Sequence, residues 1–172
     1  MMEKYKIITI VSVLVILSIV GFSILNIYAL DKLQLGGVDG YFRFYEMSVD
    51  DKIMMCNDFP MPVNFNSFKI IIFYENKLLG TFMGDGTSIM PHSFFDARGK
   101  YISESYAQSQ YLFMHFDHLF GGSDPTIRID PRNMNVITEF HTSIMGIPYS
   151  VTEQYSSFDF WNMLNDKNNM SC

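Results

Sequence analysis

Residues 7–30 read IITIVSVLVILSIVGFSILNIYAL and contain no charged side chain. Only Thr9, three serines and Asn26 interrupt the isoleucine, valine and leucine with polar groups. A transmembrane helix needs about 20 predominantly apolar residues at about 1.5 Å rise each. Because a helix satisfies its own backbone hydrogen bonds in lipid, the many β-branched residues do not argue against one. The stretch therefore predicts one transmembrane helix.

Lysines before this helix predict its orientation. Lys4 and Lys6 precede the apolar run, whereas Asp31 and Lys32 follow it and roughly cancel. Since positive charge favours the cytoplasmic side of a span, we expect a single-pass protein of the cell membrane, with the N-terminus in the cytoplasm and the C-terminal domain outside. The alternative is a cleaved signal peptide, but these have apolar cores of about 7–15 residues and a small-x-small cleavage site. The longer run here favours a retained signal anchor.

The part of the chain after the helix has the size of one ordinary domain. The chain has sixteen phenylalanines and ten tyrosines. Those that follow the helix are expected to supply much of the core, since each aromatic side chain can bury about 150–250 Å². The formal net charge of −6 and the lack of a Lys/Arg stripe exclude nucleic acid from the expected partners. Cys56 and Cys172 can pair in an oxidising compartment, but polar tails such as the one ending in Cys172 are commonly mobile. The sequence leaves this pairing open.

Short aromatic and β-branched runs, separated by Pro, Gly or charged turns, follow the helix. They predict strands at 41–47, 52–56, 65–74, 78–83, 88–90, 93–101, 126–130, 135–142 and 149–155. Gly84-Asp85-Gly86 is expected to break the fourth of these strands. Strands at intervals of about 8–12 residues with such turns are typical of an antiparallel β-sandwich.

One segment between the early and late strands has helical periodicity. Tyr111, Leu112, His115 and Leu119 share a face at helical spacing, which predicts a helix over 103–119. We therefore expect a mainly β chain: an antiparallel sandwich with one inserted helix, preceded by a single transmembrane helix.

These elements predict the following division of the chain. Residues 1–6 are a cytoplasmic N-terminus, 7–30 the transmembrane helix, and 31–40 a linker. The extracytoplasmic β-sandwich domain occupies 41–164, and 165–172 form a flexible tail.

Four patches in a fixed order resemble a known family. They are residues 55–63, which end a strand at Asn57 and two prolines; 68–80, an extended strand, a short turn and then Leu-Gly; 90–93, a break at Pro91; and 138–150, a strand, a Gly turn and a closing strand. Their order and spacing resemble the late-embryogenesis-abundant type 2 family, also called the water-stress and hypersensitive-response domain. Asp58 stands where that family usually has proline.

The resemblance covers roughly residues 40–160, nearly the whole predicted outer domain. It implies a fibronectin-III-like β-sandwich that is often membrane-anchored and is associated with stress protection or surface interaction. It implies no catalytic residues, and a fold does not by itself fix a function.

The strongest candidate for a metal site is the histidine pair His115 and His118. On a helix, imidazoles three residues apart are neighbours and can share a metal ion. His92, Met90, Met114 and Asp117 are further candidate ligands, and methionine sulfur with imidazole suits copper. The competing interpretation is that His115 lies on the buried face and His118 near a helix C-terminus, where a cation is favourable.

No catalytic motif accompanies these candidates. Gly-x-Ser-x-Gly is absent, and Gly84-Asp85-Gly86 lacks the Lys-Ser/Thr ending and the helix of a phosphate-binding loop. The aromatic cluster of Tyr155, Phe158, Phe160 and Trp161 fits either a segment that closes the core or a patch for a partner or the membrane interface. We therefore expect no enzyme and no cofactor.

The function that the sequence predicts is an extracytoplasmic interaction or stress-protection module without catalytic activity. Its expected partners are the lipid bilayer, through residues 7–30, and a protein of the membrane or envelope. Two alternatives stay open: a copper-type metal-binding envelope protein with His115 and His118 as first ligands, and an accessory subunit of a membrane complex.

Overall fold

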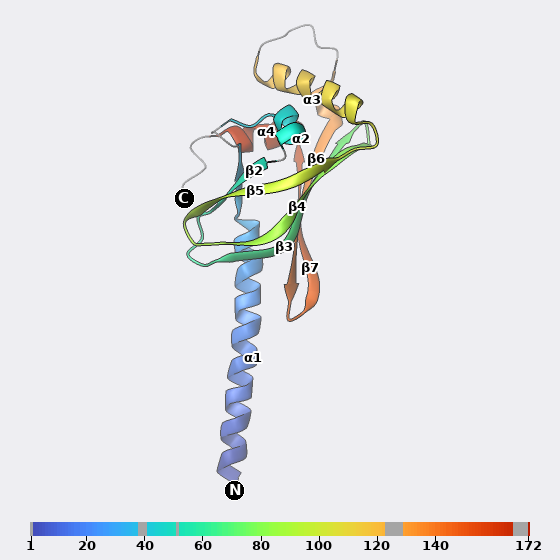
Figure 1. Ribbon diagram of the computed structural model, residues 1–172. Helices are drawn as coiled ribbons and strands as arrows, with labels where there is room; N and C mark the ends of the chain where they lie inside the picture. Colours follow the sequence, from blue (N-terminus) through green and yellow to red (C-terminus); the bar gives the residue numbers. More distant parts are fainter. Residues whose placement is uncertain (1, 38–40, 51, 123–128, 167–171) are drawn as a thin grey trace.

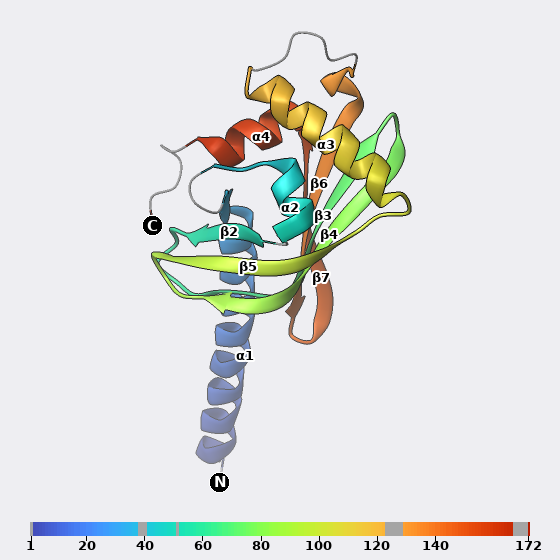
Figure 2. The ribbon, with the colours of Figure 1, turned by 45° about the horizontal axis from the view of Figure 1, so that its top comes forward.

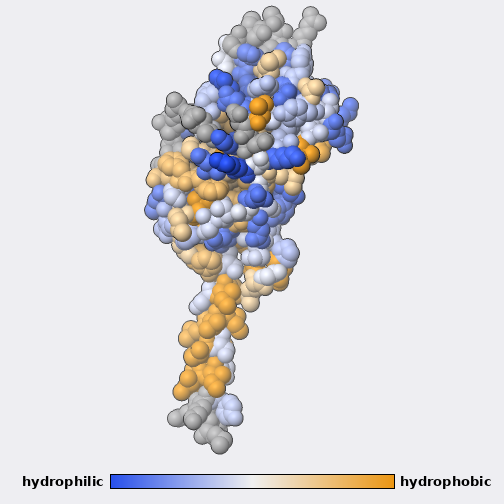
Figure 3. Space-filling model, in the orientation of Figure 1, coloured by the Kyte–Doolittle hydropathy of each residue, from blue (hydrophilic) through white to orange (hydrophobic). Residues whose placement is uncertain are grey.

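Helix α1 (Met2–Asp31) stands beneath a β domain, with the N-terminus at its far end (Figure 1). This computed structural model describes residues 2–37, 41–50, 52–122, 129–166 and 172. The side chains of Tyr5 to Ile19 are exposed all around α1, and its lower part forms a hydrophobic column in Figure 3. The predicted apolar N-terminal helix is therefore confirmed, and it is long and apolar enough to cross a membrane or to serve as a signal sequence.

Seven strands form one curled antiparallel sheet in the order β1-β2-β5-β4-β3-β6-β7. They are β1 (Gln34–Gly36), β2 (Lys52–Asn57), β3 (Val63–Tyr74), β4 (Lys77–Ile89), β5 (Ser93–Ile102), β6 (Met134–Ile144) and β7 (Ile147–Ser156). As the alternation in β3 predicts, Ile70 and Ile72 are fully buried, whereas Lys69 and Ile71 lie on the outer face. The prediction of a mainly β chain is confirmed.

The sheet curls because β5 changes partner along its length. Its first part pairs with β2, from Ser93 opposite Asn57 to Arg98 opposite Lys52. Its last part pairs with β4, from Gly99 opposite Gly84 onwards. A Cβ atom at Gly84 would overlap the ring of Phe68, so only glycine lets this strand cross the core so closely.

Helices close the concave side of the curled sheet. Helices α2 (Phe44–Asp50), α3 (Tyr106–Phe120) and α4 (Ser157–Asn165) gather at the end of the domain away from the N-terminus of α1 (Figure 2). A short 3₁₀ turn, η2 (Pro131–Asn133), precedes β6. Between the helices and the sheet lie fully buried phenylalanines: Phe44, Phe68, Phe82, Phe113, Phe116 and Phe160. Burial of Phe160 and Leu164 in α4 shows that the aromatic segment near the C-terminus closes the core.

The structure corrects several predicted elements. Residues 44–47 of the predicted strand 41–47 belong instead to α2, because Phe44, Met47 and Ser48 are buried at helical spacing. Strand β4 does not break at Gly84-Asp85-Gly86 but continues to Ile89, paired with β3 throughout.

Other predicted boundaries also differ. The predicted linker, 31–40, contains β1, which pairs with β2. The predicted helix 103–119 is present as α3, and it buries Ser109, Leu112, Phe113 and Phe116. Of the face predicted from the spacing only Leu112 is buried, whereas Tyr111 is exposed and His115 and Leu119 are partly exposed. The strand expected at 126–130 lies largely outside the described residues.

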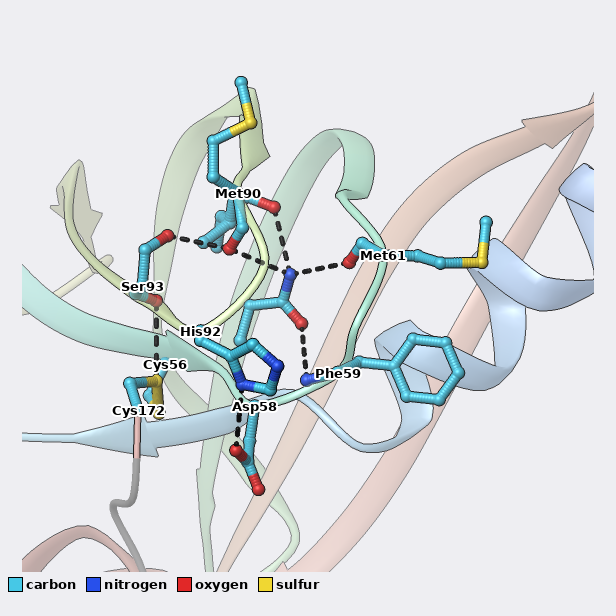
Figure 4. A network of polar contacts seen from close by, with 10 residues as sticks. Cys56, Asp58, Phe59, Met61, Met90, His92, Ser93 and Cys172 are labelled. Carbon is cyan, nitrogen blue, oxygen red and sulfur yellow. Dashed lines mark hydrogen bonds and ion pairs between the residues drawn. A yellow bond between two sulfur atoms is a disulfide. The ribbon is translucent and has the colours of Figure 1, made fainter.

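A disulfide fixes the end of the chain to the sheet. Cys172 is bonded to Cys56 of β2, and their Cα atoms are 6.0 Å apart. The cysteine sulfur of Cys172 also lies 3.5 Å from the carbonyl oxygen of Ser93 in β5 (Figure 4). The bond spans 116 residues of sequence, so it removes much freedom from the unfolded chain.

Replacing Cys172 by serine should lower the free energy of unfolding by about 2–5 kcal/mol, because the loop that the disulfide closes is long. The measurement is guanidinium denaturation of the full chain in detergent micelles, followed by fluorescence of the single tryptophan, Trp161. Reducing the unmodified chain should cause the same loss, and reducing Cys172→Ser should cause none. Equal stability of Cys172→Ser and the unmodified chain under oxidising conditions would contradict this role.

Candidate functional site

The C-terminal end of α1 is part of the core of the domain. Ala29 and Leu30 are 1% and 2% exposed, and Asn26 is 7% exposed. Burial begins at Val20, where the domain first covers the helix, and the helix contacts β3, β6 and β7. Helix α1 and the domain therefore meet through packed side chains over about three helical turns, and not through a free linker.

The Asn26 side chain holds this junction together. Its Nδ2 donates hydrogen bonds to the carbonyl oxygen of Asn64 (2.8 Å) and to Oγ1 of Thr142 (3.2 Å). Its Oδ1 accepts a hydrogen bond from the backbone N–H of Asn64 (2.7 Å). The amide thus pairs with both backbone groups of one residue near the start of β3, as a neighbouring strand would. Without this amide the N–H of Asn64 would lose its partner, and its carbonyl oxygen would keep only the hydroxyl of Thr142, which lies 3.3 Å away.

A second contact at the junction comes from the loop between β2 and β3. The Asn57 amide donates to the carbonyl oxygens of Met61 (2.9 Å), Ile89 (3.0 Å) and Met90 (3.1 Å), and its oxygen accepts from the N–H of Phe59 (3.1 Å). In Figure 4 these bonds converge between the loop that joins β2 to β3 and the turn that joins β4 to β5. They hold the Phe59 ring against Tyr28 of α1, with ring centroids 5.7 Å apart. The rings of Phe59 and Tyr28 thus form an apolar contact between α1 and the domain, beside the hydrogen bonds of Asn26.

The outer face of the sheet carries an apolar groove. Its volume is about 390 Å³, and it crosses β3, β4 and the end of β5; its lining residues include Ile71, Phe73, Leu78, Met83 and Ile102. Leu78 and Ile102 are each 52% exposed. Lys69 and Glu104 also line the groove. Exposed apolar side chains gathered in this way are typical of an interaction surface.

A second pocket, of about 430 Å³, lies between α2 and α3. Asp117 of α3 accepts hydrogen bonds there from the backbone N–H groups of Phe44 and Tyr45, both 2.8 Å long. Burial raises the pKa of Asp117 from 3.8 to about 6, although these N–H groups and Arg43 act in the opposite direction. Because the folded pKa lies above the unfolded value, the contribution of Asp117 to stability falls as the pH rises from about 4 through 6. The residue stabilises the start of α2, which explains its position.

The two candidate metal ligands on α3 lie in different surroundings. His115 stacks edge-on against Tyr111, with ring centroids 4.2 Å apart, and its buried Nε2 has no hydrogen-bond partner among the described residues. His118 is exposed and lines the pocket between α2 and α3, together with Met114 and Asp117. Within the described part of the chain, no three His, Cys, Asp or Glu side chains gather as a metal site would require. A metal site at His115 and His118 stays a prediction from sequence.

The remaining candidate ligand, His92, lies far from this pair in the fold. It follows β4, and its Nδ1 is 3.4 Å from a carboxylate oxygen of Asp58 (Figure 4). Both side chains are about half exposed. The structure therefore does not bring His92 together with the ligands proposed on α3.

Sequence reasoning missed the role of Asn26. In the sequence Asn26 is one of five polar residues that interrupt the apolar helix. It is the only one of the five with a side-chain amide, since Thr9, Ser12, Ser18 and Ser23 carry hydroxyl groups. Thr9, Ser18 and Ser23 donate to carbonyl groups of their own helix, which lie four residues earlier. A side-chain amide has more hydrogen-bonding groups than a hydroxyl, and its own helix does not pair all of them. An asparagine near the end of an apolar helix therefore indicates a hydrogen-bond partner in another part of the fold.

Comparisons with known proteins give little further information. No family model matches the chain, and no curated protein matches it. A crystal structure of a protein from Archaeoglobus fulgidus is similar at 9% sequence identity and a TM-score of 0.31, over 73% of this chain and 93% of the other. A likeness at that TM-score supports no conclusion about fold or function.

Replacing Asn26 by leucine should lower the free energy of unfolding of the domain by about 1–3 kcal/mol, because the similar-sized side chain leaves the N–H of Asn64 without its partner and the Asn64 carbonyl oxygen with the Thr142 hydroxyl alone. The matched control is Ser18→Ala, which removes a hydroxyl bonded only within α1 and should change stability by less than about 0.5 kcal/mol. Guanidinium denaturation in micelles measures both. Equal effects of the two substitutions would show that Asn26 does not hold the junction.

Proposed function

We propose that this chain is a single-pass, extracytoplasmic interaction module without catalytic activity, whose anchor holds the domain at a fixed height and angle above the membrane. The observation that carries the proposal is the apolar groove on the outer sheet face, in a domain whose core includes the end of the anchor. A rigidly held surface of this kind suits a partner in the same membrane, since little orientational freedom is lost on binding.

Retention of α1 in the mature protein is supported by the core. Cleavage near Ala29 would remove Asn26 and its bonds to Asn64 and Thr142 and would cut beside Leu30, which is almost fully buried. Signal peptides are discarded and do not ordinarily supply core residues to the protein that they export. We therefore assign α1 as an anchor.

Two observations support the location of the domain outside the cytoplasm. Lys4 and Lys6 favour a cytoplasmic N-terminus. The disulfide between Cys56 and Cys172 is of the kind that persists in oxidising compartments. A domain on the outer side satisfies both.

The partner is proposed to be a protein of the same membrane or envelope. This chain would then be an accessory subunit of a membrane complex. Outer-face residues stand in rows across the strands: Ile71 is paired with Thr81 and with Ile137, and Thr81 with Ile102. A row of this kind offers an apolar surface several strands wide. Lys69 and Glu139, 4.0 Å apart beside the row, supply both signs of charge at its border.

The family resemblance stays part of this proposal. The change of partner along β5, from β2 to β4, curls the sheet and supports a sandwich-like architecture of the fibronectin-III-like kind. The role in stress protection that the late-embryogenesis-abundant type 2 family implies would be exercised through binding at the membrane. It requires no catalytic site.

Photo-crosslinking residues placed at Leu78 and Ile102 in native membranes should each give one discrete protein adduct, because both side chains lie in the groove and are half exposed. Met83→Lys should reduce the adduct at least about tenfold, since a charge buried in an interface costs more than about 1.4 kcal/mol. Met114 on α3, 43% exposed and outside the groove, is the matched control position.

An adduct of twice the chain's mass would identify a second copy as the partner at this face. The proposal is contradicted if Leu78 and Ile102 give no adduct, or if Met114 gives the same adducts. Turnover of a substrate that depends on one side chain of the domain would also contradict it.

A further inference from the structure

The hairpin between β6 and β7 ends in an apolar tip, which we define as residues 143–149. Met145 and Gly146 have φ angles of 51° and 83°, as the tight turn of a two-residue hairpin requires. Met145, Ile147 and Tyr149 are 55%, 68% and 44% exposed. No charged residue occurs from 142 to 152. Solvent-exposed turns are ordinarily polar, so the composition of this tip calls for an explanation.

The hairpin tip points along α1 towards the N-terminus of the chain, and both ribbon views show it lying beside the helix (Figures 1 and 2). The hydrogen bond between Thr142 and Asn26 sets the base of the tip level with Asn26. From Thr142 to Met145 the strand advances three residues, or about 10 Å. The same length along α1 corresponds to about seven residues. The tip therefore reaches the level of Ile19, and burial of α1 begins at the next residue, Val20.

The length of free helix decides what surrounds the tip. Only residues 7–19 of the uncharged run lie beyond the domain, and they measure about 20 Å along the axis. A bilayer has a hydrocarbon core of about 30 Å. A domain kept wholly outside the membrane would leave the anchor about 10 Å too short. The membrane must therefore rise along α1 past Ile19, to the level of the hairpin tip.

The opposite end of the same sheet provides an internal comparison. The turn between β3 and β4 is at the far end from the hairpin tip, because Tyr74 pairs with Met134 at the beginning of β6. That turn carries Glu75 and Lys77, as a turn in water would. Of these two turns, only the one beside α1 lacks charged residues.

Tyrosines mark the expected membrane boundary. Tyr28 of α1 is 53% exposed and lies just beyond Asn26, and Tyr149 is paired with Thr142, which bonds to Asn26. Tyrosine is enriched at the level of lipid headgroups. The two rings are therefore placed where the hydrocarbon gives way to the headgroups.

We infer that the hairpin tip, through Met145 and Ile147, is buried in the lipid of the leaflet beneath the domain and acts as a second membrane contact beside α1. This inference rests on the proposed membrane anchor. Interfacial segments enter lipid by about 5–10 Å, and the unpaired backbone edge of β7 confines the insertion to the tip, since such groups are not tolerated deep in hydrocarbon. Pro148 has no N–H to leave unpaired there. The tip and the helix together fix the rotation of the domain about the membrane normal.

The test uses the full chain with two substitutions, Trp161→Phe and Ile147→Trp, so that the only tryptophan lies at the hairpin tip. The protein is reconstituted in phosphatidylcholine vesicles. Its fluorescence is measured with lipids that carry bromine at a shallow or at a deep position of the acyl chain, because bromine quenches tryptophan on contact. We expect blue-shifted emission and stronger loss of fluorescence with the shallow bromines. The matched control, Leu78→Trp, has similar exposure and lies in the groove beside the distal turn, and it should be quenched by neither lipid. Extraction at alkaline pH reports separately whether the chain stays in the bilayer.

Each outcome decides the inference. Resistance to extraction with no quenching at Ile147→Trp would overturn the lipid contact and leave the anchor intact. A blue shift without quenching would assign the tip to a protein contact and would likewise overturn it. Release of the chain by extraction would overturn both the anchor and the lipid contact.

Discussion

The pairing of one side-chain amide with one backbone peptide group determines how the rest of this protein is organised. Asn26 satisfies the N–H and the carbonyl of Asn64 near the start of β3 and reaches Thr142 on β6. It is almost buried, at the point where an apolar helix leaves its exposed stretch and enters the core. Since an unpaired amide in an apolar environment costs several kcal/mol, the helix has a strong preference for one rotation and one height against the sheet.

That constraint joins features that are otherwise separate. With α1 fixed, the β6–β7 hairpin lies beside the helix, the loop at Asn57 brings Phe59 onto Tyr28, and the groove on the outer sheet face takes a set direction relative to α1. The helices and buried phenylalanines close the opposite end of the domain. The proposed function depends on this geometry, because it requires a groove that is held at a fixed position relative to α1.

Much of this architecture can be predicted from the sequence, because local patterns encode it. The uncharged run, the alternation along β3 and the periodicity of α3 each identified their element. Residues 44–47 were mistaken for a strand because aromatic residues favour strands locally, whereas their helix begins on hydrogen bonds to Asp117, 73 residues away from Phe44. The buried face of α3, the continuation of β4 through Gly84 and the partner of Asn26 likewise depend on contacts between distant segments. The groove was visible only in part, as apolar residues on both faces of β3.

The most direct test of this account measures the distance between α1 and the domain. Spin-labelled amino acids introduced at Leu14 and Leu78, both exposed, would report it by pulsed electron paramagnetic resonance in lipid bilayers, without disturbing the disulfide. The account predicts a single narrow distance distribution in the unmodified chain, which Asn26→Leu broadens. A broad distribution in the unmodified chain, as a flexible linker between helix and domain would give, would contradict it.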